Sequence, residues 1–140
     1  VVGDYDGDGK DDAAVYRPSN NTWYLNRSSA GSFSLAWGTS GDKVVPADYD
    51  GDGKTDIAVY RPSTGYWYRY FMGSGTNDYV YHGLSTDIPV PGDYDGDGKA
   101  DAAVFRPSTG YWHLKRSTAG DISIPYGSNG DKPTPSAFVY

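Results

Sequence analysis

The chain has 140 residues, a formal net charge of −6 at pH 7 and no cysteine. Its basic residues form no stripe that could neutralise phosphates, which argues against a nucleic-acid partner, and no apolar run approaches the ~20 residues of a membrane span. With 19 glycines, 9 prolines and 16% aromatic residues, the composition favours short strands and tight turns over helices.

An aspartate-rich loop recurs three times along the chain. It reads Asp4-Tyr-Asp-Gly-Asp-Gly-Lys-Asp-Asp12 first, and it returns at residues 48–56 and 93–101. The leading aspartates stand at positions 4, 48 and 93, so the periods are 44 and 45 residues. An arginine 13 residues later and a tryptophan 19 residues later keep the same register in every copy. Internal repetition at such a period predicts a repeat architecture.

Four short strands are predicted in each repeat. In the second copy they cover residues 45–49, 56–61, 66–71 and 78–82. The first runs into the aspartate loop, and the segment Pro62-Ser-Thr-Gly65 has turn chemistry between the second and third. The one-residue difference between the periods is placed in the turn at residues 73–77, where an insertion costs little. Four antiparallel strands in about 45 residues are typical of a β-propeller blade.

The predicted fold is therefore all-β, with three four-stranded blades. We expect blade 1 at residues 1–43, blade 2 at 44–87 and blade 3 at 88–132. Residues 133–140 then form the closing strand of a fourth unit, in which Ala137 replaces the leading aspartate. Propellers have about 4–8 blades, and open sheet edges invite pairing. We expect a partial ring, completed by further blades of the same precursor or, as the second choice, by a homodimer partner.

The aspartate loops have the composition of calcium sites. Ca²⁺ takes about 6–8 oxygen ligands in a flexible geometry. Carboxylates at loop positions 1, 3, 5 and 9 and the carbonyl of the lysine at position 7 are the predicted ligands. They are Asp4, Asp6, Asp8, Lys10 and Asp12; Asp48, Asp50, Asp52, Lys54 and Asp56; and Asp93, Asp95, Asp97, Lys99 and Asp101. The lysine side chains are expected to point to water.

Two other interpretations of the loops are weaker. An EF-hand requires glutamate at position 12, where this chain has Val15, Val59 and Val104. Three aspartate-rich turns without metal would place mutually repelling carboxylates together and raise some of their pKa values. Metal removes that conflict, so three Ca²⁺ sites are predicted.

The loops and the Ala-Val-Tyr-Arg-Pro-Ser segments that follow the first two of them resemble FG-GAP/VCBS-type repeats, the blades of integrin-α-like propellers. The resemblance covers essentially the whole chain. It implies a propeller with structural Ca²⁺ on one face. Members of that family serve in adhesion, in sugar binding and as accessory modules of secreted bacterial enzymes. The Phe-Gly and Gly-Ala-Pro signatures are not literally present, so no integrin-like ligand specificity is inferred.

Periodic aromatic and basic residues are candidates for ligand binding. One tryptophan per copy could stack on a sugar ring, but strict periodicity favours packing between blades: Trp23, Trp67 and Trp112. A second position varies between copies, which predicts exposure and a ligand rim: Trp37, His82 and Tyr126. The periodic arginines could bind an anion, but pairing with an aspartate is favoured; the two sets are Arg17, Arg61 and Arg106, and Asp42, Asp87 and Asp131.

Nothing in the sequence indicates catalysis. The two histidines, His82 and His113, occupy different places in the repeat, and no cysteine nucleophile exists. We therefore expect a calcium-binding, non-catalytic binding or adhesion module with carbohydrate or protein partners at the cell surface. Millimolar extracellular calcium suits such loops, which predicts a secreted or cell-surface location. The alternatives are a lectin that binds sugars between blades and a C-terminal accessory domain of a secreted hydrolase.

Overall fold

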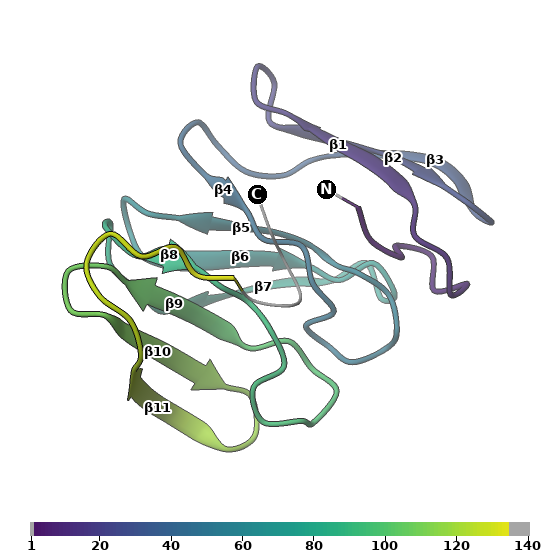
Figure 1. The fold of residues 1–140 in the computed structure, drawn as a ribbon. Coiled ribbons are helices and arrows are strands. Elements are labelled where there is room, and N and C mark those ends of the chain that lie inside the picture. Colours follow the sequence, from purple (N-terminus) through teal and green to yellow (C-terminus); the bar gives the residue numbers. More distant parts are fainter. Residues whose placement is uncertain (1, 135–140) are drawn as a thin grey trace.

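A computed structural model describes residues 2–134 of the chain. Within these residues the structure contains strands, turns and loops, and it forms three separate antiparallel sheets that lie side by side (Figure 1). No helix of the described part is long and apolar enough to cross a membrane. We call the sheets blade 1, blade 2 and blade 3 in chain order.

Each blade is a meander in which sequential strands are neighbours. Blade 1 consists of β1 (Ala13–Arg17), β2 (Thr22–Arg27) and β3 (Gly31–Ala36). Blade 2 consists of β4 (Lys43–Val44), β5 (Ile57–Arg61), β6 (Tyr66–Tyr70) and β7 (Asn77–Tyr81). Blade 3 consists of β8 (Ile88–Pro89), β9 (Ala102–Arg106), β10 (Tyr111–Arg116) and β11 (Gly120–Pro125).

The predicted first strand of each repeat is much shorter than expected. In blade 2 the ladder pairs Val44 with Val59, then resumes only as the isolated bridge between Ala47 and Asp56. Pro46 lies in the gap and has no N–H to donate. Within the described residues, blade 1 retains only the equivalent bridge, Gly3 to Asp12, so it has three strands and not the four that were predicted.

The hydrophobic core lies between the blades. Trp23 and Leu25 of blade 1 pack with Ile57 and Val59 of blade 2 in one cluster. A second cluster joins blades 2 and 3, with members that include Trp67 and Val104. Such face-to-face packing of small sheets is the arrangement found in propellers, and it leaves an outward face on blade 1 and another on blade 3.

Two sequence-predicted segments have distinct outcomes. The longer turn of the second repeat is confirmed, because residues 71–76 connect β6 to β7 whereas residues 28–30 and 117–119 make the equivalent turns. The predicted closing strand at 133–140 lies mostly outside the described residues; Pro133 and Thr134 are in a loop.

Candidate metal centre

The leading aspartate of each loop organises the backbone around itself. Gly7 N–H donates to Asp4 Oδ1 at 2.7 Å and Gly9 N–H donates to Asp4 Oδ2 at 2.8 Å. The loops at Asp48 and Asp93 repeat both bonds. Gly7 and Gly9 have φ values of 79° and 86°, which glycine adopts without steric penalty. The chain therefore coils with its next carboxylates turned towards the first.

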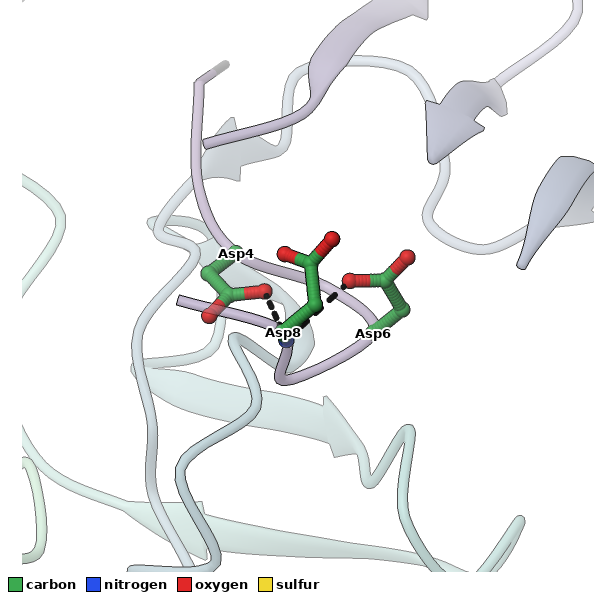
Figure 2. Close-up of side chains that lie close together, drawn as sticks. All are labelled: Asp4, Asp6 and Asp8. Carbon is green, nitrogen blue, oxygen red and sulfur yellow. Dashed lines mark hydrogen bonds between the residues drawn. The ribbon is translucent and has the colours of Figure 1, made fainter. Parts of the chain in front are cut away.

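Figure 2 shows the result in blade 1, where the side chains of Asp4, Asp6 and Asp8 lie together. Asp8 N–H donates to Oδ1 of Asp4 at 3.2 Å and to Oδ1 of Asp6 at 3.4 Å. Each blade has one group of three carboxylates with oxygen atoms within 4.8 Å of one another: Asp4, Asp6 and Asp8; Asp48, Asp50 and Asp56; and Asp93, Asp95 and Asp101. These groups leave out Asp12, Asp52 and Asp97, so each contains three of the four predicted carboxylates.

The aspartate at loop position 9 is buried and connects three segments. Asp12 accepts hydrogen bonds from Tyr5 N–H at 2.8 Å and from Ser28 N–H at 2.8 Å. Asp56 and Asp101 accept the equivalent pairs of bonds. Because Ser28 belongs to the β2–β3 turn, this carboxylate fastens the loop to the far end of its own blade. Sequence reasoning predicted it as a ligand only and missed this second role.

In blade 1 the β2–β3 turn covers the aspartate loop, and in blade 3 the β10–β11 turn does the same. In blade 1, Asp6 Oδ2 accepts N–H bonds from Ser29 and Ala30 at 2.8 and 3.0 Å. The Ser28 hydroxyl donates to Asp8 Oδ2 at 2.5 Å, and the Ser29 hydroxyl donates to the same oxygen. Blade 3 repeats these contacts with Ser117, Thr118 and Ala119.

Blade 2 lacks this cover. Met72 and Gly73 occupy the places of the two hydroxyl residues, and Met72 N–H bonds only to Asp56, at 3.0 Å. A Cβ built on Gly73 would lie 1.9 Å from Asp52 Oδ2. The backbone of the longer turn therefore approaches the Asp52 carboxylate so closely that a side chain would displace it.

The pKa values of the carboxylates follow this difference. Hydroxyl donors from Ser28 and Ser29 lower the pKa of Asp8 to about 2, and those of Ser117 and Thr118 lower the pKa of Asp97. In blade 2, burial raises the pKa of Asp56 to about 7. Burial, followed by the neighbouring Asp52, raises the pKa of Asp50 to about 6. In the middle loop, burial therefore outweighs the backbone N–H bonds that Asp56 accepts.

The donor set fits a hard cation. All side-chain ligands in the three groups are carboxylates, with no nitrogen or sulfur donor, and such sites suit Ca²⁺, Mg²⁺ or Mn²⁺. A divalent ion would neutralise the carboxylates that repel one another in blade 2. The three groups could therefore hold metal ions. The backbone carbonyl predicted as a further ligand in each loop, at loop position 7, belongs to Lys10, Lys54 and Lys99.

Backbone bonds link each loop to the next. Thr55 N–H donates to Asp4 O at 2.7 Å, and Ala100 N–H donates to Asp48 O at 2.8 Å. A Cβ on Gly7 would meet Lys54 Cγ at 3.0 Å. The expectation that the lysines point to water is thus wrong for the stem of Lys54, which covers the preceding loop. The loops that carry the three groups therefore follow one another along one side of the array (Figure 1).

Two of the three periodic arginines make the predicted aspartate pairs. Arg61 makes two 2.9 Å bonds to the carboxylate of Asp42, and Arg106 makes two 2.8 Å bonds to that of Asp87. Arg17 lies instead over the ring of Tyr24, 4.4 Å from its centroid.

Two of the three periodic tryptophans, Trp23 and Trp67, lie between blades, whereas Trp112 packs against its own blade. Trp23 and Trp67 are fully buried, and their indole N–H groups donate to Trp37 O at 3.1 Å and His82 O at 2.8 Å. Trp112 is half-buried and donates to Tyr126 O at 2.8 Å. Burial on this scale leaves Trp23 and Trp67 no face for an external sugar ring.

The prediction of an exposed rim at Trp37 is wrong. Trp37 is half-buried, and its indole N–H donates to Tyr68 O of blade 2 at 3.1 Å. His82 Nε2 lies 2.8 Å from His113 O of blade 3, the equivalent carbonyl. Of this set, only Tyr126 is exposed, at 79%. The side chain varies between copies, but in Trp37 and His82 it bridges two blades.

Sequence reasoning missed a cluster of four tyrosines on blade 2. Their rings pair across β6 and β7 with centroid separations of 5.4–6.2 Å: Tyr66, Tyr68, Tyr79 and Tyr81. Tyr79 and Tyr81 are 65% and 58% exposed. Alternation of tyrosine in two adjacent strands was the available signal, because alternate residues share one face of a sheet.

Comparison with known proteins agrees with the repeat geometry. No curated protein and no solved structure matches the chain significantly. The profile of the FG-GAP-like repeat matches twice, at residues 4–59 and 48–104. Each match begins at a leading aspartate and extends into the second strand of the following repeat. The chain therefore belongs to the FG-GAP-like repeat family.

Proposed function

We propose that this chain is a calcium-binding, non-catalytic module in which one Ca²⁺ per blade stabilises a rigid row of blades that presents a binding surface outside the cell. The observation that carries the proposal is the threefold recurrence of converging carboxylates at one place in the repeat. A structural ion must be provided in every blade, whereas a ligand site is needed once.

Calcium suits these loops better than magnesium. Mg²⁺ requires nearly ideal octahedral geometry and retains several waters, whereas Ca²⁺ accepts six to eight oxygens in flexible loops. The glycine-rich backbone and the carboxylate-only side-chain set favour the larger ion. Extracellular calcium-binding modules have dissociation constants of about 10⁻⁴–10⁻³ M, and loops of this kind would be occupied in a secreted or cell-surface location.

The loops are placed to transmit metal binding to the whole array. The position-9 aspartate connects each loop to its own blade, as Asp12 does with Ser28. The Thr55–Asp4 and Ala100–Asp48 bonds connect each loop to the preceding one. An ion that orders one loop therefore restrains two blades.

A non-catalytic role agrees with the family, whose repeats are typically structural modules, and with the engagement of both histidines. His82 bridges two blades, and His113 Nδ1 lies 2.8 Å from Ser123 Oγ within its own sheet. Neither histidine lies with a serine and an aspartate in a triad arrangement among the contacts of the described residues.

Thermal unfolding with and without calcium tests the proposal. EDTA should lower the melting temperature by many degrees, and excess Ca²⁺ should restore it more fully than equimolar Mg²⁺. Asp50→Asn should weaken the calcium response, whereas Asp11→Asn is the matched control. Asp11 is an exposed loop aspartate outside the carboxylate groups. Identical melting in EDTA and calcium contradicts the proposal.

A second candidate function is carbohydrate binding, favoured by the exposed tyrosine cluster of Tyr66, Tyr68, Tyr79 and Tyr81. Aromatic faces hold apolar and cationic groups of ligands, and hydroxyls at their edge bond to polar ones. A glycan array followed by titration of intrinsic fluorescence measures it. Tyr79→Ala should abolish a response that Tyr111→Ala, at an exposed tyrosine outside the cluster, retains. Absence of any response across broad sugar classes removes this candidate.

A further inference from the structure

The outward face of blade 1 exposes residues that are buried in the other two blades. Val15 is 56% exposed, whereas its repeat equivalents Val59 and Val104 are completely buried. The neighbouring Ala13 is exposed as well. In blades 2 and 3 these positions are covered by the preceding blade, so the sequence of blade 1 retains an apolar surface with the pattern of an interface. We call this surface the head face.

The outward face of blade 3 shows the converse. Tyr126 is 79% exposed and Ile124 is also exposed. Their equivalents in blade 1, Trp37 and Leu35, are half-buried against blade 2. We call this surface the tail face. It carries large side chains at the two repeat positions through which blade 1 covers blade 2.

Two kinds of hydrogen bond recur between successive blades, and residues 2–134 contain no further blade to continue either kind at these two faces. In the first, the residue before the position-9 aspartate donates N–H to the preceding leading aspartate, as Thr55 does to Asp4 O. In the second, the variable side chain donates to a carbonyl of the next blade, as Trp37 does to Tyr68 O. At the tail, the corresponding acceptor is Asp93 O and the corresponding donor is the Tyr126 hydroxyl.

The head face carries the opposite partners. By repeat position, the donor there is Asp11 N–H and the acceptor is Tyr24 O. Among residues 2–134, the recurring contacts place no preceding blade against Asp11 or Tyr24. Each donor of one face thus corresponds to an acceptor of the other face, and the apolar residues correspond in the same way.

A hollow on the head face provides room for a large side chain. Its volume is about 510 Å³, and its lining includes Ala13, Val15 and Tyr24. On blade 2, the equivalent region is filled from blade 1, where Trp37 lies edge-on to Tyr70 with ring centroids 5.6 Å apart. The residue that occupies the Trp37 position on the tail face is Tyr126.

We propose that the tail face of one copy binds the head face of a second copy, and that two such contacts close a ring of two chains. The partner is a second copy because its tail face repeats, position by position, the internal interface that the head face lacks. Head-to-tail contacts form closed rings only when the rotation between copies closes. The three blades of residues 2–134, taken twice, give six blades, within the about 4–8 blades that propellers contain.

This pairing concerns side chains outside the metal groups, so it goes beyond calcium binding. Sedimentation velocity of the full chain in excess CaCl₂ should show a dimer that dissociates on dilution. Val15→Asp and Ile124→Asp should each give monomers, because either change breaks both contacts of a ring. Leu84→Asp should remain dimeric, since Leu84 is an exposed apolar residue outside both faces. Circular dichroism verifies that each variant is folded.

Mixing the two monomeric variants distinguishes the geometry. A copy with Val15→Asp retains an intact tail face, and a copy with Ile124→Asp retains an intact head face. The mixture should therefore form a dimer through one intact contact. Head-to-head pairing would instead leave Ile124→Asp dimeric, and tail-to-tail pairing would leave Val15→Asp dimeric. If either variant unfolds, the milder Tyr126→Ala should still weaken the wild-type dimer severalfold.

Three results overturn the proposal. They are a wild-type chain that stays monomeric at its highest soluble concentration, a mixture of the variants that does not pair, and open polymers in place of closed dimers.

Discussion

Gly73 lies directly over the carboxylate of Asp52, so closely that a Cβ there would be 1.9 Å from Asp52 Oδ2. Blades 1 and 3 have Ser29 and Thr118 at this position and use their hydroxyls to bond the equivalent aspartates. The middle site has exchanged a hydroxyl donor for a close backbone approach. The three carboxylate groups are therefore chemically unequal, although their loop motifs are almost identical.

Gly73→Ala should weaken calcium binding at one site of three. The added methyl group pushes the Asp52 carboxylate aside, and displacing a supporting or ligating group at a metal site typically lowers affinity by about 10–100-fold. Calorimetric titration measures the affinities. Ser74→Ala, in the same turn, should leave all three unchanged. Unaltered binding by the Gly73 variant would show that Asp52 does not contribute to the site.

The metal-free protein should lose stability as pH rises from about 4 to about 7. The pKa of Asp56 is about 7 and that of Asp50 about 6, both above the ordinary 3.8. The folded state therefore binds more protons than the unfolded state in this window, and deprotonation favours unfolding. Asp8, with its pKa lowered to about 2, acts in the opposite sense and loses its contribution only below about pH 4.

Urea unfolding in EDTA at several pH values measures this slope. Asp56→Asn should flatten it, because the amide does not titrate. Excess calcium should reverse it, since the ion binds the deprotonated carboxylates. A metal-free protein that becomes steadily more stable from about pH 4 to 7 would contradict the charge imbalance assigned to blade 2.

The Arg106–Asp87 pair should be far more important for stability than the Arg69–Asp78 pair. Asp87 is 1% exposed and accepts two 2.8 Å bonds from Arg106, whereas Asp78 lies at the surface. Removing one partner of a buried pair costs about 3–5 kcal/mol, while exposed pairs contribute about 0–1 kcal/mol. Urea midpoints of Asp87→Asn and Asp78→Asn compare the two pairs, because Arg69 also lies over the rings of Tyr49 and Phe71. Equal losses would show that the burial of Asp87 carries no penalty.

Trp67→Phe should destabilise the chain more than Trp112→Phe. Both indoles donate to a backbone carbonyl, but Trp67 is fully buried whereas Trp112 is half-buried. The buried variant leaves the His82 carbonyl without its indole donor and creates a cavity, together about 2–4 kcal/mol. The measurement is the difference between the two variants in their free energy of unfolding by a chemical denaturant. A larger loss for Trp112→Phe would contradict the assignment of Trp67 to the core between blades.

Much of the architecture was predictable because it repeats. The period of the aspartate loop located the blades, and the Arg–Asp pairs of Arg61 and Arg106 followed from shared register. The loop motif also predicted four converging carboxylates in blade 1, of which Asp4, Asp6 and Asp8 do converge. These features depend on local sequence, which the repeat displays three times.

The remaining features depend on contacts between blades, which local patterns do not specify. Variation at Trp37 and His82 suggested exposure, but both side chains reach a backbone carbonyl of the next blade. A backbone acceptor tolerates any side chain that carries a donor, so residue identity is not maintained there. Likewise, the short β4 and β8 reflect proline positions within the ladder.

Calcium stoichiometry tests the central claim most directly. Native mass spectrometry of the metal-stripped chain, titrated with CaCl₂, should show three bound ions per chain and a lower count by one in Asp50→Asn, with Asp11→Asn unchanged. A chain that binds no calcium at millimolar concentration, or binds it equally in the Asp50 and Asp11 variants, would contradict the assignment of the three carboxylate groups as metal sites.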